Sequence, residues 1–332
     1  MRYLATGLWA DVQQLPGALQ DTIEAGQGVA EAADLLRGAD RIVATGNGAA
    51  YYAAHALWLA SLEADGPPVV ALPCGVVARE GFRWRDGDAV LAVSSSGEFR
   101  DVVEIAQRSA GRPCVAITAS AGSALAAASD VVVLQHVASQ RAVTHTQALA
   151  GAYACGLAVS AALTGDRGLA ALVAAAPAAA ARAVAGIDAW AAGAFPALGA
   201  PVAAIAVGGG AAWAAALELA LMLKEISRIP AEGVETREGA TSAMFGLARG
   251  HLMVSLDPDD DPLGNEAVRL CAAAGATTLR LPGPARADAR LAPITTLPAA
   301  AALAAELALA AGHDVDRPAW TDAYYETARS AT

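Results

Sequence analysis

Short apolar runs alternate with helical stretches along the first half of the chain. Residues 1–38 carry apolar positions at helical spacing, among them Leu15, Leu19 and Ile23. Five apolar runs then follow, each short enough for a buried strand, at residues 41–48, 69–72, 90–93, 114–118 and 131–134. Strands that alternate with helices predict a parallel, doubly wound sheet.

The second half of the chain repeats this pattern. Gly208 ends an apolar run 162 positions after Gly46 (208 − 46 = 162), and residues 250–253 follow residues 88–91 at the same offset. Residues 276–281 match the run at 114–118 approximately. The repeat predicts an α/β fold of two tandem, flavodoxin-like subdomains, each a doubly wound parallel sheet, related by pseudo-twofold symmetry.

These elements divide the chain into four expected segments. They are an N-terminal helical segment (1–38), a first α/β domain (39–168), an alanine-rich helical linker (169–194) and a second domain with a C-terminal tail (195–332). In the charge-rich segment 217–242, we expect Pro230 to end a helix, because proline interrupts helical hydrogen bonding. Glu232, Glu235, Arg237 and Glu238 are then expected in a loop or short turn.

The composition indicates where the protein is located and which classes of partner it does not bind. The 332 residues include 22 basic and 33 acidic ones, a formal net charge of −11, which argues against a nucleic acid or an anionic membrane as partner. The longest apolar stretch, 202–223, contains three glycines and Glu218, so we expect a strand, a turn and a helix there and no membrane span. The N-terminus does not resemble a signal peptide, and a cytoplasmic protein is expected.

Neither a metal nor a cofactor is expected. The G-x-G at Gly46–Gly48 lacks a third glycine, since position 51 is Tyr51, which argues against a nicotinamide cofactor. The cysteines form no C-x-x-C and no Cys/His cluster, so buried free thiols in a reducing compartment are expected. They are Cys74, Cys114, Cys155 and Cys271.

A serine-rich turn links the run at 90–93 to a helical pattern. Ser94, Ser95 and Ser96 would place three hydroxyls at a helix N-terminus, where unpaired N–H groups and positive partial charge favour an anion. The alternative is an ordinary serine N-cap. The matching place in the second half, 256–261, holds four aspartates, which we expect to form an acidic surface loop. The anion pocket would therefore lie in the first half.

Two glutamates share one face of a predicted helix. Glu218 and Glu225 are seven residues apart, with apolar neighbours. A carboxylate near an apolar face can have a raised pKa that suits a general base. The alternative, left open by the pattern, is a solvated face on which Lys224 and Arg228 pair with the glutamates.

Three motifs are similar to those of a known protein family. They are V-S-S-S-G-E at 93–98, A-L-E-L-A-L-M-L-K-E-I-S at 216–227 and H-D-V-D-R-P at 313–318. With them, nearly the whole chain resembles the sugar isomerase (SIS) family, in the tandem two-SIS arrangement of the isomerase domain of glucosamine-6-phosphate synthase. The resemblance implies that the serine turn binds a sugar phosphate, that Glu225 moves a proton between C1 and C2, and that the sites lie at the interface of a homodimer.

The motifs and their neighbours give a set of candidate site residues. The catalytic candidates are Glu225, His145 and Glu238. The candidate substrate contacts are Gly46, Asn47, Gly48, Ser94, Ser95, Ser96, Glu98, Phe99, Thr146 and Arg237. The only partner that this set implies is a small sugar derivative.

The sequence departs from the family pattern at several of these places. Ala50 and Phe99 stand where the family has hydroxyl residues near the phosphate, Thr241 where it has a ring-opening histidine, and Ala323 where the synthase has a lysine. We therefore expect a ligand other than the usual hexose 6-phosphate. His145 could supply an imidazole instead.

Taken together, the sequence predicts an atypical isomerase or deaminase of sugars, sugar phosphates or amino-sugar derivatives that works through an enediol or enolamine. The alternative is a non-catalytic sensor or regulatory protein that binds a sugar phosphate.

Overall fold

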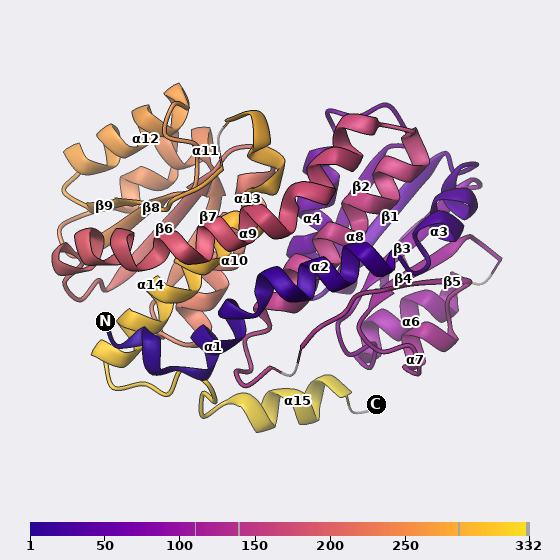
Figure 1. Cartoon of the computed structure of the whole chain (residues 1–332), viewed down its shortest axis with the longest axis horizontal. Coiled ribbons are helices and arrows are strands. Elements are labelled where there is room, and N and C mark those ends of the chain that lie inside the picture. The colour runs from indigo at the N-terminus through magenta and orange to yellow at the C-terminus, as the bar shows by residue number, and fades with distance from the viewer. Residues whose placement is uncertain (110, 139, 285, 330–332) are drawn as a thin grey trace. The chain divides into compact units, whose positions relative to one another are not determined.

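The computed structural model describes residues 1–109, 111–138, 140–284 and 286–329 (Figure 1). Residues 330–332, assigned above to the second domain, lie outside the described residues. The strands are β1 (Arg41–Gly46), β2 (Val69–Pro73), β3 (Asp88–Val93), β4 (Cys114–Thr118), β5 (Val131–Leu134), β6 (Ala203–Gly208), β7 (Ala231–Glu235), β8 (His251–Ser255) and β9 (Thr277–Arg280). The α-helices are α1 (Gly7–Gln13), α2 (Leu15–Ala25), α3 (Val29–Leu36), α4 (Ala49–Ser61), α5 (Cys74–Val77), α6 (Arg100–Arg108), α7 (Ala124–Ala127), α8 (Thr146–Thr164), α9 (Arg167–Ala194), α10 (Ala211–Glu225), α11 (Thr236–Thr241), α12 (Pro262–Ala273), α13 (Ala292–Thr295), α14 (Leu297–Ala310) and α15 (Thr321–Arg329).

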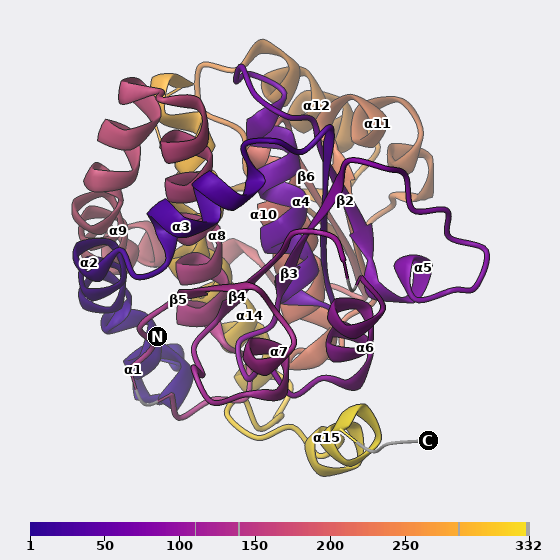
Figure 2. The same ribbon diagram turned by 90° about the vertical axis from the view of Figure 1, so that its right-hand side faces the viewer.

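The first sheet is parallel and buried on both faces. Its strand order is β2-β1-β3-β4-β5, the doubly wound order that the fold prediction implied. One face packs against α5, α6 and α7 through residues such as Val43, Val90 and Ala116. The other face presents Ile42 and Leu91 to α4 and α8, and Figure 2 shows α6 and α8 on opposite sides of the sheet. Burial of both faces explains why these strands read as continuous apolar runs.

The second sheet repeats the first four strands of the first sheet. Its order is β7-β6-β8-β9, again parallel throughout. Gly48 and Gly210, 162 positions apart, precede α4 and α10 with φ of 54° and 53°. Such positive φ angles favour glycine. The predicted α/β class with two parallel sheets is confirmed.

The two compact units of the chain are interleaved in sequence, whereas the prediction placed four segments in succession. One unit comprises 1–16, 139–146 and 177–319, and the other comprises 17–138, 147–176 and 320–332. Hydrogen bonds explain why the N-terminus belongs with the second sheet. The Asp316 carboxylate accepts from the N–H groups of Gly7 (2.7 Å) and Leu8 (2.8 Å), which stabilises the start of α1.

Two expectations for segment 217–242 are wrong. Residues 232–238 form no loop, because β7 takes Ala231–Glu235 and α11 takes Thr236–Thr241. The edge strand β7 is stabilised by its backbone pairing with β6, so it forms without an apolar run in its sequence. Helix α10 ends at Glu225, before Pro230; Arg228 already has φ of 55°, and the Ser227 hydroxyl donates to the carbonyl of Ala304 (2.7 Å).

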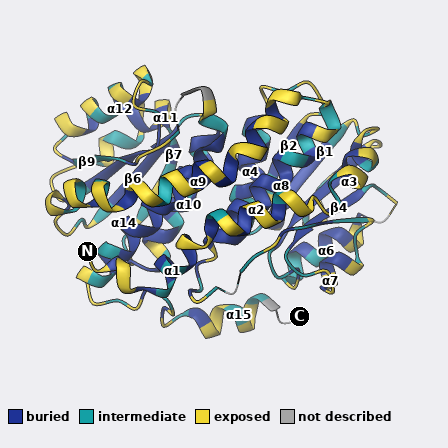
Figure 3. Cartoon of the chain, in the orientation of Figure 1, coloured by how far each residue is buried: buried dark blue, intermediate teal, exposed yellow. Residues whose placement is uncertain are grey.

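Among the described residues, three helices are long and apolar enough to span a membrane by length and composition alone. They are Thr146–Thr164, Arg167–Ala197 and Asp288–Ala310, of which the sequence pattern singled out none. Their apolar windows are 78%, 33% and 94% buried inside the protein, respectively. Figure 3 shows the exposed positions along α9, the least buried of the three. The stretch 202–223 is, as expected, a strand, a turn and a helix.

Candidate functional site

Two of the predicted ligand-binding segments meet at one end of the first sheet. Asn47 follows β1, and the serine turn follows β3, the strand that pairs with β1. The chain leaves β1 toward β2 on one side and continues from β3 toward β4 on the other. Such a switch in winding direction is where open α/β sheets bind ligands, beyond the carboxyl ends of the strands.

The serine hydroxyls mainly hold the turn itself. The Ser94 hydroxyl accepts from the N–H of Gly97 (3.1 Å), and the Ser96 hydroxyl accepts from the N–H of Glu98 (3.3 Å). Ser94 is buried, while Ser95 and Ser96 are partly exposed. The N-cap of α6 is Phe99 and has no side-chain cap, so the alternative of a serine N-cap is wrong.

Gly97 and Glu98 fix the direction of the backbone at the end of the serine turn. Gly97 has φ of 68°, and a Cβ there would lie 2.1 Å from the Ser123 hydroxyl oxygen, so only glycine fits. The exposed Glu98 carboxylate accepts from the N–H of Ala124 (3.1 Å) at the start of α7. Glu98 thereby ties the turn to α7. Phe99, next in the chain, lines a cavity together with Asn47.

Helix α10 carries two glutamates in different surroundings. Glu218 is only 3% exposed, and its Oε2 has no hydrogen-bond partner among the described residues. Burial, and then the charge of Glu225, raises the pKa of Glu218 to about 8. The alternative of a solvated, ion-paired face is therefore wrong for Glu218, which favours the neutral acid at physiological pH.

Glu225 is partly exposed and has polar neighbours. Burial raises the pKa of its carboxyl to about 7, against the lowering effects of the Lys224 charge and of a hydrogen bond from the Thr144 hydroxyl. A carboxyl that titrates near neutral pH and retains stabilisation of its ionised form can take and return a proton.

The segment before α8 supplies a neighbour that the sequence did not mark. Thr144 is buried and donates to Glu225, whereas the predicted His145 is exposed. The predicted Thr146 is fully buried, and its hydroxyl has no partner among the described residues. In this segment the contact with Glu225 comes from Thr144, and a role of His145 and Thr146 in the site stays a prediction.

Arg237 and Glu238 lie exposed on the first turn of α11. The guanidinium of Arg237 pairs with the Glu266 carboxylate at 3.0 Å, and the N–H groups of both residues donate to the Glu235 carboxylate (2.7 and 3.0 Å). Thr241, at the expected place of a histidine, donates its hydroxyl to the carbonyl of Arg237 (2.8 Å). Ala323, at the expected place of a lysine, is an exposed residue of α15.

Asp257 corrects the expectation of an acidic surface loop after β8. It is 2% exposed, and its carboxylate accepts from the N–H of Gly209 (2.7 Å) and the hydroxyl of Thr236 (2.8 Å). Burial nevertheless raises its pKa. The carboxylate thus occupies the N–H of Gly209, which follows β6, the strand equivalent to β1, and its negative charge opposes an external anion at this turn.

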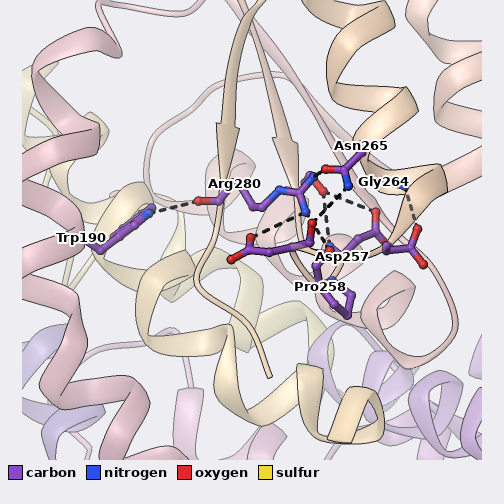
Figure 4. A network of polar contacts seen from close by, with 9 residues as sticks. Trp190, Asp257, Pro258, Gly264, Asn265 and Arg280 are labelled. Carbon is purple, nitrogen blue, oxygen red and sulfur yellow. Dashed lines mark hydrogen bonds and ion pairs between the residues drawn. The ribbon is translucent and has the colours of Figure 1, made fainter. Parts of the chain in front are cut away.

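A polar network continues from Asp257 to the surface (Figure 4). Arg280 donates to the carbonyl of Pro258 (2.7 Å) and to the amide oxygen of Asn265 (2.9 Å), while its own carbonyl accepts from the indole of Trp190 (3.1 Å). These contacts keep the loop after β8 in place beside the buried carboxylate. In the first sheet, the turn at Asn47 instead borders a cavity.

Comparison with solved structures finds the same fold in other proteins. A Silicibacter pomeroyi protein assigned as a phosphosugar isomerase is 26% identical, with a TM-score of 0.81, over 94% of this chain and 100% of that one. The C-terminal domain of glucosamine-fructose-6-phosphate aminotransferase from Francisella tularensis is 18% identical (TM-score 0.79, 94% and 98% covered). Glucosamine-6-phosphate deaminase from Thermotoga maritima is 19% identical (TM-score 0.73, 95% and 98% covered).

The family comparison identifies one domain within this fold. No curated protein matches the chain. The family model of the SIS domain matches residues 35–164, which contain the whole first sheet, the G-N-G turn and the serine turn. Residues 35–164 are therefore similar to the SIS domain, as the resemblance implied for this part of the chain.

Proposed function

We propose that the protein is an isomerase or deaminase of sugars, sugar phosphates or amino-sugar derivatives that works by proton transfer through an enediol or enolamine. The observation that carries this proposal is the Glu225 carboxyl. It is partly exposed, has a pKa of about 7 and accepts a hydrogen bond from Thr144. The Silicibacter pomeroyi structure, described as a phosphosugar isomerase, supports the substrate class.

Glu225 has the properties that this chemistry requires of a base. In an aldose-to-ketose step, the carboxylate removes the proton from C2 while the carbonyl oxygen at C1 gains one, which gives the enediol. The glutamic acid then returns its proton to C1 while the C2 hydroxyl gives up its proton to solvent, which balances the proton that solvent supplied to the C1 oxygen and leaves the C2 carbonyl of the ketose. One group with a pKa near the working pH serves both steps, because neither its acid nor its base form is strongly disfavoured.

The remaining candidates would bind the sugar derivative. Gly46, Asn47 and Gly48 follow β1, and the partly exposed Ser95 and Ser96 follow β3, so both turns offer polar groups at the switch point. Thr241 and Ala323 supply no acid–base group for ring opening, and we therefore propose an open-chain or altered substrate. We also propose a cytoplasmic homodimer without a nucleic-acid or membrane partner, consistent with the net charge of −11.

The test is solvent exchange at the reacting carbon. The full chain is incubated in deuterium oxide with hexose phosphates, hexosamine phosphates and their unphosphorylated analogues, and the substrates are followed by proton NMR. The proposal expects loss of the C2 proton signal of at least one sugar, at a rate proportional to enzyme concentration. Absence of exchange across the whole panel would contradict an isomerase or deaminase.

A non-catalytic sensor is the second candidate, because Thr241 bonds to the backbone and Ala323 has no functional side chain. Thermal stabilisation by one of the same sugars, without any exchange at C2, would favour this function over the first.

A further inference from the structure

A cavity at the switch point of the first sheet has two aromatic side chains, Phe99 and Tyr324, among its walls. Its volume is about 290 Å³, and its walls include Asn47, Phe99, Arg100, Asp101 and Tyr324. Asn47 comes from the turn after β1, Phe99 from the turn after β3, and Tyr324 from α15, which lies next to α6 (Figure 2). An apolar cavity of about 150 Å³ holds a benzene molecule in another protein. The cavity here is large enough for a ring and its attachment.

The rings around this cavity form a connected cluster. The Phe99 ring centroid lies 6.1 Å from that of Tyr324 and 6.4 Å from that of Tyr325. Trp320 extends the cluster at 5.7 Å from Tyr324. Tyr324 remains 45% exposed, although such rings usually gain from burial. A further ring inserted beside Phe99 would cover this exposed aromatic surface.

The charges at the cavity disfavour an anion. The first turn of α6 carries Asp101, whose carboxylate occupies the positive end of the helix. Arg100 pairs with that carboxylate at 3.2 Å, so the two side chains contribute no net charge. The N-cap Phe99 offers no hydroxyl. A phosphate here would meet a carboxylate and aromatic rings, whereas an uncharged ring would meet no opposing charge.

The backbone holds Phe99 in position before any ligand binds. The positive φ of Gly97, its contact with Ser123 and the bond from Glu98 to the N–H of Ala124 fix the turn that carries the ring. The N–H of Leu125 also donates to the carbonyl of Gly97 (3.0 Å). A preorganised aromatic wall lowers the entropy cost of binding.

We propose that this cavity is a subsite for an uncharged aromatic substituent on the sugar derivative, which stacks against Phe99 and Tyr324. The inference rests on the proposed function, since it names the part of the substrate that replaces a phosphate at this end. The amide of Asn47 would orient the atom that joins the ring to the sugar. Aryl-substituted sugars would then be preferred over sugar phosphates.

The experiment compares matched ligands by isothermal titration on the full chain. The ligands are the 6-O-phenyl and 6-O-methyl ethers of glucosamine, which leave C1 free, with glucosamine 6-phosphate as the anionic alternative. Because stacking and burial of a ring add to affinity, the phenyl ether should bind tighter than the methyl ether by on the order of tenfold or more. Phe99→Ala and Tyr324→Ala should reduce that preference to about threefold or less.

Phe245→Ala is the matched control, because Phe245 is 83% exposed and belongs to the other compact unit. It should leave the preference for the phenyl ether unchanged. The half-exposed Tyr324 keeps the test valid if Phe99→Ala does not fold. Equal affinity for the two ethers, a preference that survives both variants, or tighter binding of glucosamine 6-phosphate would each overturn the subsite.

The outcomes also separate this inference from the proposed function. If a sugar exchanges at C2 but the phenyl group adds no affinity, the subsite is contradicted and the proposed enzymatic function stands. If the phenyl group adds affinity that depends on Phe99 but no sugar exchanges, the enzymatic function is contradicted and the subsite stands.

Discussion

Two glutamates on one helix acquire different chemistry from their surroundings. Glu225 receives a hydrogen bond from Thr144 and the field of Lys224, both of which favour its ionised form. Glu218 has neither, and the charge of Glu225 raises its pKa further. Glu225 therefore ionises first, near pH 7, and Glu218 stays neutral until about pH 8.

The stability of the protein should fall as the pH rises through this range. Both carboxyls bind protons more tightly in the folded chain than in the unfolded chain, so their stabilising effect is complete below about pH 4.5 and is lost as the pH passes 7 to 8. Glu218→Gln should remove part of this fall. The free energy of unfolding, measured with urea at pH 5.5 and 8.5, should differ less for the variant than for the wild type. An unchanged difference would show that Glu218 does not titrate in this range.

The hydrogen bond from Thr144 should set the pH at which the enzyme becomes active. Because it favours the ionised base, Thr144→Val should shift the rising limb of the rate profile from near pH 7 to a higher pH, by about one unit. Thr144→Ser keeps a hydroxyl and should retain the original profile. The measurement is the C2 exchange rate from pH 5 to 9, and a limb that does not move in Thr144→Val would contradict this role.

At the residue scale, the sequence indicated a candidate base only where a motif contains it. Glu225 lies in such a motif, and the apolar neighbours correctly indicated a raised pKa for a carboxyl on this helix. Thr144 was missed because it is 81 residues away (225 − 144 = 81) and carries no local pattern. The exposure of His145 depends on how the segment before α8 packs, which spacing does not determine.

At the element scale, the turn after β6 and the turn after β1 have similar backbone conformations, since Gly210 and Gly48 have φ of 53° and 54°. They differ in the groups that lie against them. Asp257 occupies the N–H of Gly209 and the hydroxyl of Thr236, whereas the turn beside Asn47 opens onto a cavity. A buried carboxylate inside the fold thus stabilises one turn permanently. The other turn remains available for a ligand.

Replacing Asp257 should therefore destabilise the fold. Asp257→Ala leaves the buried Thr236 hydroxyl and the partly buried N–H of Gly209 without this acceptor, and we expect a loss of about 2–4 kcal/mol in the free energy of unfolding. Asp259→Ala is the control: that side chain is 94% exposed and lies 3.7 Å from Arg280, so its loss should change stability by less than about 0.5 kcal/mol. Similar values for the two variants in urea denaturation would refute this account of Asp257.

Strand β7 shows why an element can escape prediction. Its sequence, A-E-G-V-E, lacks an apolar run, and only pairing with β6 makes it a strand. The repeat contained the missing signal, since β2 begins at Val69 and β7 begins at Ala231, 162 positions later (231 − 69 = 162). The strands of the first sheet were predictable because burial on both faces made each one apolar.

At the scale of the whole molecule, helices with membrane-like composition are mainly interior elements. The apolar windows of the helices at 288–310 and 146–164 are 94% and 78% buried by protein, so they need no lipid. Helix α9 is exposed along much of its length, but largely through alanine, which suits a helix surface in water.

The protein should accordingly be recovered in the aqueous fraction. After lysis without detergent and high-speed centrifugation, we expect the full chain in the supernatant, as a species that does not change when a mild detergent is added. Recovery only from the pellet, with release by detergent, would contradict the proposed location.

The central claim is that Glu225 moves the proton, and isotope exchange in matched variants tests it most directly. With a sugar that exchanges in the wild type, Glu225→Gln should lower the C2 exchange rate by at least about 100-fold, the usual contribution of a positioned base. Glu218→Gln, on the same helix, should exchange within a few-fold of the wild type at pH 7. Undiminished exchange in Glu225→Gln, with both variants folded, would contradict the account.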